Sequence, residues 1–251
     1  MNRTALGLII MCAAGLAGPP LAFADPRLDE KVYAPYVQNH VFELELRRGR
    51  EIGGPLGRAQ SDVIEAEYGL NDNVSLALVA NIHQEPDGSP HLNGVGLEGV
   101  AYLGQIPHTG VDVGLYLEYI GGLNGEDDAA EAKLLLAKNI DRFQALFNFI
   151  VERPIGAPAS EDFASYGYAA SATWRTFGAL RVGVEAFGDL GDDRGIGREG
   201  AYVGPQLRWE GHPGSSPIEI EVEAGWLAAV GADRDEADSQ VRFTIAVERR
   251  L

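Results

Sequence analysis

Carboxylate side chains occupy every second position along several segments of this sequence. The clearest run lies at 218–226, where Glu219, Glu221 and Glu223 alternate with apolar residues. Carboxylates at this spacing project from one face of an extended chain, because successive side chains of a strand point to opposite sides. A wall of such groups concentrates cations from solution. The spacing therefore indicates electrostatic selection of positive ions along one surface.

The same alternation places further charged residues on this face, and acidic members outnumber basic ones. The acidic members are Glu43, Glu45, Glu65, Glu67, Glu98, Asp112, Glu118, Glu131, Glu152, Glu185, Glu219, Glu221, Glu223 and Glu248. The basic members are Arg47, Lys133, Arg175, Arg181, Arg208 and Arg242. A common face for all of them requires elements that hold alternate side chains on one side of a sheet.

Alternation of apolar and polar residues recurs in about twelve segments of roughly nine to eleven residues, the length of a tilted membrane-spanning strand. The segments begin near Val41, Asp62, Val74, Val95, Val111, Ala130, Phe143, Tyr166, Leu180, Tyr202, Ile218 and Val241. A helix would scatter the apolar members around its circumference. The stretch at 129–138 has the most helical composition, but its neighbours favour a strand there too.

The connections between these segments tend to alternate in length. Longer polar loops are expected between short turns at Gly69–Asn73, Gly104–Gly110, Asn139–Arg142, Arg175–Ala179 and Glu210–Pro217. Short periplasmic turns, longer outer loops and an even strand number are typical of outer-membrane barrels. The sequence therefore predicts an all-β fold, a transmembrane antiparallel up-and-down β-barrel of about twelve strands.

The apolar face of the segments is nearly free of charge and carries large aromatic residues at its ends. Phe42, Trp174 and Trp209 fall at turn ends, whereas Tyr119 and Trp226 fall at loop ends. A lipid-facing surface favours this arrangement, since Arg or Lys at the bilayer midplane costs about 2–4 kcal/mol. A soluble sandwich, the alternative, would also alternate, but it explains neither the carboxylate face nor the two aromatic belts.

Two motifs resemble those of the bacterial outer-membrane β-barrel superfamily. The turn at Tyr68–Asn73 is similar to the Y-G-x-x-D-x periplasmic turn of these barrels, and Val32–Val37 resembles the leader of uncharacterised proteobacterial members. The resemblance implies a porin-like protein in the outer membrane of a Gram-negative bacterium. It also implies outer-membrane lipid, lipopolysaccharide and the barrel-assembly machinery as partners. These barrels typically end in an aromatic residue, whereas this chain ends in Leu251, which keeps the parity of the lipid-facing residues.

The chain is expected to divide into three parts. Residues 1–24 combine a positive start, a short apolar run and a small-residue exit, which predicts a cleaved secretory signal peptide. Residues 25–39 are expected to form a periplasmic N-terminal leader that either plugs the lumen or trails from it, and residues 40–251 to form the barrel. Cleavage would remove Cys12, the only cysteine, so we expect the mature chain to fold without disulfides.

Charge and hydropathy exclude several classes of protein. The formal net charge of −17 makes the chain a poor partner for nucleic acid or anionic lipid headgroups. No second long apolar run follows the first one, which excludes a helical membrane protein.

Other chemistry has weaker support. A loop flanked by His83 and His91 is better explained as a solvated loop than as a metal site, because tight ligand spacing is missing. The same holds for acidic residues that could bind calcium or bridge lipopolysaccharide cations at Asp189, Asp192, Asp193 and Glu199. A hydrolase would need Ser and His together on the lipid-facing side, and no such pair occurs at strand spacing. We expect no enzyme activity, cofactor or metal.

The charged face of the strands is expected to line the lumen. The leading hypothesis for function is a narrow passive channel for small cations or polar solutes, because many unmatched carboxylates in a dry interior would be costly. The alternative is a non-conducting structural or interaction barrel that acts through its outer loops. The sequence indicates neither the solute nor the oligomeric state.

Overall fold

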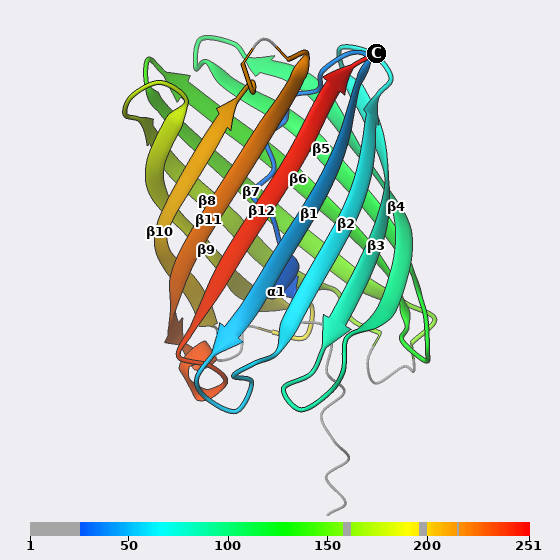
Figure 1. Ribbon diagram of the computed structural model, residues 1–251. Coiled ribbons are helices and arrows are strands. Elements are labelled where there is room, and N and C mark those ends of the chain that lie inside the picture. Colours follow the sequence, from blue (N-terminus) through cyan, green and yellow to red (C-terminus); the bar gives the residue numbers. More distant parts are fainter. Residues whose placement is uncertain (1–25, 158–161, 196–199, 215) are drawn as a thin grey trace, which may run out of the picture.

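The computed structural model describes residues 26–157, 162–195, 200–214 and 216–251, which form a closed barrel of antiparallel strands (Figure 1). A four-residue helix, α1 (Pro26–Asp29), precedes the first strand, and a short 3-10 helix, η1 (Ala232–Asp235), precedes the last. The strands are β1 (Val41–Ile52), β2 (Gln60–Gly69), β3 (Val74–Gln84), β4 (His91–Ile106), β5 (Val111–Gly122), β6 (Asp128–Ile140), β7 (Phe143–Ile155), β8 (Ser165–Arg175), β9 (Leu180–Asp192), β10 (Gly200–Gly211), β11 (Ile218–Gly231) and β12 (Ser239–Arg250).

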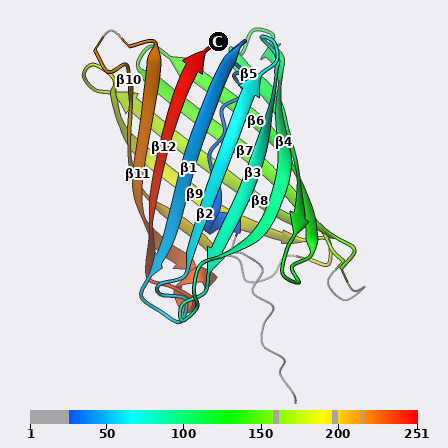
Figure 2. The same ribbon diagram turned by 45° about the vertical axis from the view of Figure 1, so that its right-hand side comes forward.

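Each strand pairs with its neighbours in the chain, and β1 pairs with β12 to close the barrel. The closing register runs from Val41 opposite Arg250 to Ile52 opposite Ser239 (Figure 2). The predicted fold class is therefore confirmed, and the stretch at 129–138 lies within strand β6. None of the helices among the described residues is long and apolar enough to cross a membrane.

The two ends of the barrel differ. The start of β1 and the C-terminus lie at one end, the turn end, which also carries the connections predicted to be short (Figure 1). The opposite end, the loop end, carries longer connections, including the one that contains η1. In outer-membrane barrels the short turns face the periplasm, so the turn end is the expected periplasmic end of this barrel.

The apolar face of the strands points outward. Leu78 is 64% exposed, Leu97 60% and Leu117 55%, and Trp174 and Trp226 are also exposed. A continuous exposed apolar surface of this kind requires an apolar surrounding. The predicted lipid-facing set is thus on the outside of the barrel.

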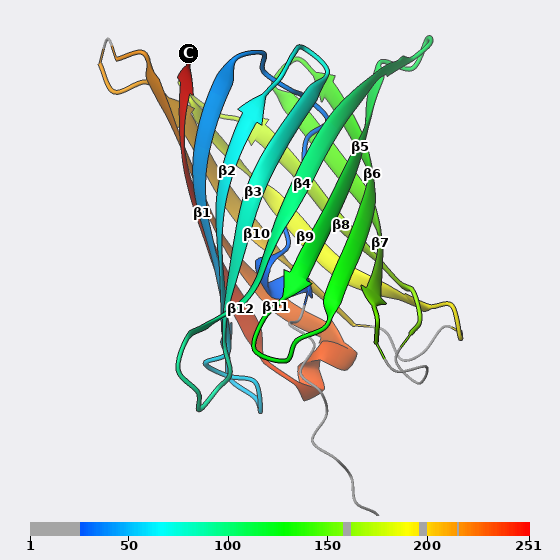
Figure 3. The ribbon, with the colours of Figure 1, turned by 90° about the vertical axis from the view of Figure 1, so that its right-hand side faces the viewer.

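The interior of the barrel holds the N-terminal segment. Residues 26–39, called the leader below, run from α1 near the loop end to the start of β1 at the turn end, inside the ring of strands (Figure 3). Leu28 is 2% exposed and Tyr33 4%. The sequence left open whether this segment plugs the lumen or trails into the periplasm; it lies in the lumen.

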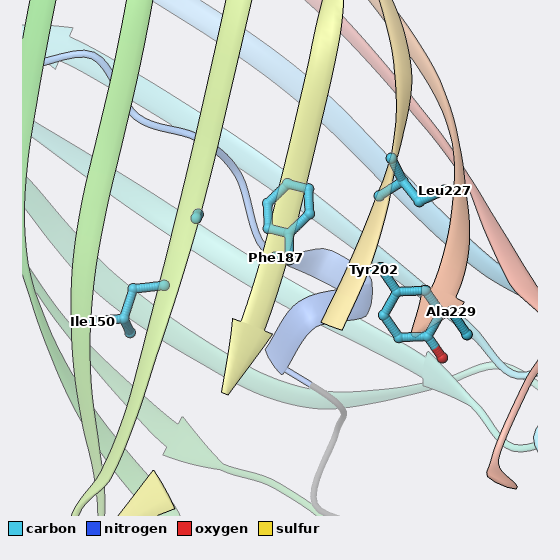
Figure 4. Packing of buried hydrophobic residues seen from close by; sticks show 6 residues of the cluster. Ile150, Phe187, Tyr202, Leu227 and Ala229 are labelled. Atoms are coloured by element: carbon cyan, nitrogen blue, oxygen red, sulfur yellow. The ribbon is translucent and has the colours of Figure 1, made fainter. Parts of the chain in front are cut away.

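Apolar residues on the inner face of the strands explain part of this placement. One buried cluster packs against Val32 of the leader and consists of Ile150, Ala169, Phe187, Tyr202, Leu227 and Ala229 (Figure 4). A second cluster contains Tyr33 itself with Val100, Tyr116 and Leu135, and Val37 packs against it. Burial of these surfaces favours a leader inside the barrel over one in solvent.

Candidate functional site: the lumen and its leader

The first contacts of the leader lie near the loop end. The Ser61 hydroxyl donates a 2.7 Å hydrogen bond to Oδ2 of Asp29. The strand position next to Leu28 is Gly49, where a Cβ atom would clash with the main-chain carbonyl of Leu28. A residue without a side chain is needed there because the leader backbone lies directly against the wall.

Asn148 binds the main chain of Tyr33 in the middle of the lumen. The Tyr33 N–H donates to Oδ1 of Asn148 at 2.7 Å, and Nδ2 of Asn148 donates to the Tyr33 carbonyl at 2.9 Å. The side-chain amide thereby satisfies both main-chain polar groups of Tyr33. Asn148 is 0% exposed, so water does not compete for these bonds.

The Tyr33 side chain joins the leader to charged residues of the wall. Its hydroxyl accepts a 2.8 Å hydrogen bond from Nη1 of Arg47 and donates to Oε2 of Glu98 at 3.4 Å. Its ring centroid lies 4.6 Å from that of Tyr116. The Lys133 ammonium lies 4.7 Å from the Tyr33 ring centroid and 4.6 Å from the Tyr116 ring centroid, which adds cation–π attraction.

The leader also exchanges charges with the wall. Lys31 pairs with Glu45 at 2.6 Å, and Glu30 pairs with Lys133 at 2.5 Å. Within the wall, Arg47 lies 3.2 Å from both Glu45 and Glu65. Most of these groups are buried, where an unpaired charge would be expensive. Removal of one partner would therefore leave the other uncompensated.

At the turn end the contacts are more exposed. The Tyr36 hydroxyl donates to Oδ2 of Asp112 at 2.9 Å and accepts from Nδ2 of Asn139 at 2.6 Å. Partial burial and the bond to Asp112 raise the pKa of the Tyr36 phenol above its ordinary value. Nε2 of Gln38 donates to Oε2 of Glu248 at 3.1 Å.

A cavity of about 420 Å³ lies between the leader and the wall at the turn end. Its acidic lining residues are Glu43, Glu45, Glu67, Glu210, Glu221, Glu223 and Glu248, and its basic ones are Lys31, Arg175, Arg181 and Arg208. We call this cavity the vestibule. Arg208 pairs with Glu221 at 2.5 Å and with Glu223 at 3.3 Å. The lining therefore carries more negative than positive groups.

Other charged residues that the sequence placed in the lumen do not line the vestibule. Glu118, Glu131 and Glu152 are neighbours in register across β5, β6 and β7. Glu185 is buried, and the Arg242 guanidinium lies 3.9 Å from the Phe187 ring centroid. Glu219 is 3.8 Å from His212 and does not line the vestibule.

The histidine loop and the acidic loop residues considered above as metal sites make other contacts in the described part of the chain. The rings of His83 and His91 meet edge to face at 6.2 Å, and Asp87 pairs with Arg58. Asp192 pairs with Arg194. Residues 1–25, which include the expected signal peptide, and Glu199 lie outside the described residues.

Sequence reasoning missed the residues that hold the leader, above all Asn148 and Tyr33. They lie 115 residues apart, and nothing in their local sequence indicates contact. The apolar residues of inward parity, such as Phe187 and Leu227, were the available signal, because a purely aqueous lumen would not favour them.

Several solved barrels resemble this structure. The COG4313 outer-membrane channel from Pseudomonas putida F1 aligns over 90% of this chain and 98% of its own, with 10% identity and a TM-score of 0.57. The NanC porin aligns over 83% and 100%, with 12% identity and a TM-score of 0.56. The KdgM porin in complex with disordered oligogalacturonate aligns over 83% and 99%, with 11% identity and a TM-score of 0.53.

No protein-family model and no curated protein sequence matches this chain. The likeness to solved structures establishes the fold. This fold is the closed β-barrel of the outer-membrane channel and porins to which the chain is similar.

Proposed function

We propose that this protein is an outer-membrane channel for small polar solutes that prefers cations and whose lumen is restricted by its own leader. The main support for the proposal is the vestibule, a cavity of about 420 Å³ inside a closed barrel, whose lining has more carboxylates than basic groups. A cavity wall of one predominant sign raises the local concentration of counter-ions and lowers that of co-ions.

The acidic lining of the vestibule also bears on which class of solute could pass. The KdgM porin was solved with oligogalacturonate, which is a polyanion. A polyanion would meet Glu43, Glu67 and Glu248 at the vestibule of the present chain, and carboxylates there disfavour a solute of the same sign. Small cations and neutral polar solutes are therefore the better candidates.

A second candidate function has its own support. The leader packs the middle of the lumen, with Tyr33 4% exposed, and a barrel filled in this way need not conduct. Such a protein would act through its outer loops as a structural or interaction barrel. The two candidates differ in one measurable property, the passage of ions.

The test is single-channel recording of the refolded protein in a planar bilayer under a KCl gradient. We expect small discrete current steps and a reversal potential of the sign that K⁺ selectivity produces. A barrel that is correctly folded, as judged by heat-modifiable electrophoretic mobility, but never conducts would exclude the channel and favour the second candidate. Steps that select Cl⁻ would refute the cation preference alone.

A further inference from the structure

We propose that Glu65, Glu67 and Glu98 form a binding site for a hard divalent cation, with Ca²⁺ as the ion of best fit. Each residue offers one carboxylate oxygen, and these oxygens lie within 4.8 Å of one another. Oxygens that share a Ca²⁺ ion at 2.3–2.6 Å can be separated by up to roughly 5 Å, so the spacing suits shared coordination. The inference does not depend on whether the barrel conducts.

The strand register brings the three residues together. Glu65 and Glu67 are two positions apart on β2, so both side chains point inward. Ala77 of β3 is the register partner of Glu67 on one side and of Glu98 on the other. Because Ala77 has only a methyl side chain, the carboxylates on either side of it can approach each other above β3.

Two buried oxygen atoms of this group accept no hydrogen bond. They are Oε1 of Glu65 and Oε1 of Glu98, which belong to side chains that are 1% and 2% exposed. A buried carboxylate oxygen without a partner is unfavourable, and a cation satisfies it directly. This feature is independent of the clustering itself and indicates a positively charged ligand.

The other oxygens of the same carboxylates are held in place by the protein. Nη2 of Arg47 donates to Oε2 of Glu65 at 3.2 Å, and the Tyr116 hydroxyl donates to Oε2 of Glu98 at 3.0 Å. Such outer contacts orient ligating groups before the ion arrives. Arg47 also contacts Glu45, so its one positive charge is shared among more than one carboxylate.

The chemistry of the donors and the route of access both favour a hard ion. All three residues offer oxygen, which suits Ca²⁺ or Mg²⁺ rather than metals that prefer nitrogen or sulfur. Two of the carboxylates come from one strand and the third from another, and Ca²⁺ tolerates such irregular geometry better than Mg²⁺ does. Glu67 also lines the vestibule, so an ion can reach the group from the turn end.

The test uses Tb³⁺ as the probe, because it replaces Ca²⁺ at oxygen sites and emits when a nearby tyrosine is excited. The Tyr33 and Tyr116 hydroxyls lie 3.4 and 3.0 Å from Oε2 of Glu98. We expect the full-length folded protein in detergent to give saturable tyrosine-sensitised Tb³⁺ emission that Ca²⁺ reverses. Lack of such emission, or emission that Ca²⁺ does not reverse, would overturn the proposal.

Variants locate the site. Glu65→Gln and Glu98→Gln are expected to weaken Tb³⁺ and Ca²⁺ binding at least about tenfold, because each removes a charged ligand. Glu219→Gln is the matched control, with the same change of charge outside the group, and should leave the affinity unchanged. If the buried variants do not fold, Glu67→Gln, which alters the more exposed member, carries the test. Unchanged affinity in every folded variant of the group would refute the site.

Discussion

The leader is more deeply buried in the loop half and the middle of the lumen than in the turn half. Leu28 is 2% exposed and Tyr33 4%, whereas Tyr36 is 42% exposed. Near the loop end Leu28 lies against Gly49 of the wall, and in the middle of the lumen Asn148 binds both main-chain groups of Tyr33. In the turn half, Tyr36 and Gln38 make more exposed contacts, and the vestibule of about 420 Å³ remains beside them. The leader therefore fills the lumen to different extents along the barrel axis.

The largest effect on stability is expected from Arg47→Gln, in the part of the lumen where the leader is buried. This substitution leaves Glu45 and Glu65 without the guanidinium that both contact at 3.2 Å. We expect a loss of about 3–5 kcal/mol in the free energy of unfolding, since Glu65 loses the partner of its buried charge, whereas Glu45 keeps Lys31. Denaturant titration in detergent measures it. Arg153→Gln, which breaks the exposed pair with Asp162, should cost less than about 1 kcal/mol, and equal losses would contradict the account.

Asn148→Ala is expected to release the leader without removing a charge. It leaves the N–H and carbonyl of Tyr33 unpaired, at a cost of about 1–3 kcal/mol. Each 1.4 kcal/mol corresponds to about a tenfold change in the population of a displaced leader. Single-channel recordings should therefore show a higher open fraction. Asn139→Ala, which removes the exposed contact with Tyr36, should change the open fraction much less.

Gly49→Ala tests the same half of the lumen by steric means. The added Cβ would clash with the Leu28 carbonyl, so α1 must shift away from β1. We expect the leader to lose about 1–3 kcal/mol of its stabilisation, the usual cost of overpacking. Faster hydrogen exchange of the leader amides would report it. Gly121→Ala, where the nearest atom lies 3.6 Å away, should leave exchange unchanged.

The smallest effect is expected in the vestibule, from Glu43→Gln. This change removes one carboxylate among several in a solvated lining. We expect the K⁺ over Cl⁻ permeability ratio to fall by roughly twofold or less, since the remaining carboxylates maintain the potential. The reversal potential under a KCl gradient measures the ratio. A complete loss of selectivity would show that one residue, and not the combined lining, determines it.

The strands could be predicted from sequence because their signal is local. Alternation at 218–226 is sufficient to define both faces of β11, and similar patterns located the other strands. The contents of the lumen could not be predicted in this way. Contacts such as that of Tyr33 with Asn148 depend on register summed over several strands.

The same reason explains why the carboxylate group was not recognised. Glu65 and Glu67 are close in sequence, but Glu98 reaches them only through the pairing of Ala77 with both neighbouring strands. Spacing along the chain carries no signal for that convergence. Alternation along a strand predicts that each of these side chains points into the lumen. It does not predict which side chains of other strands lie beside it.

The most direct test of the central claim compares unitary conductance with and without the leader. A variant that lacks residues 26–37 should still form the barrel, because all strands and the closing register remain. Heat-modifiable mobility checks this. We expect a clearly larger unitary conductance for the shortened protein, with cation preference retained. Equal conductance in two correctly folded proteins would contradict the claim that the leader restricts the lumen.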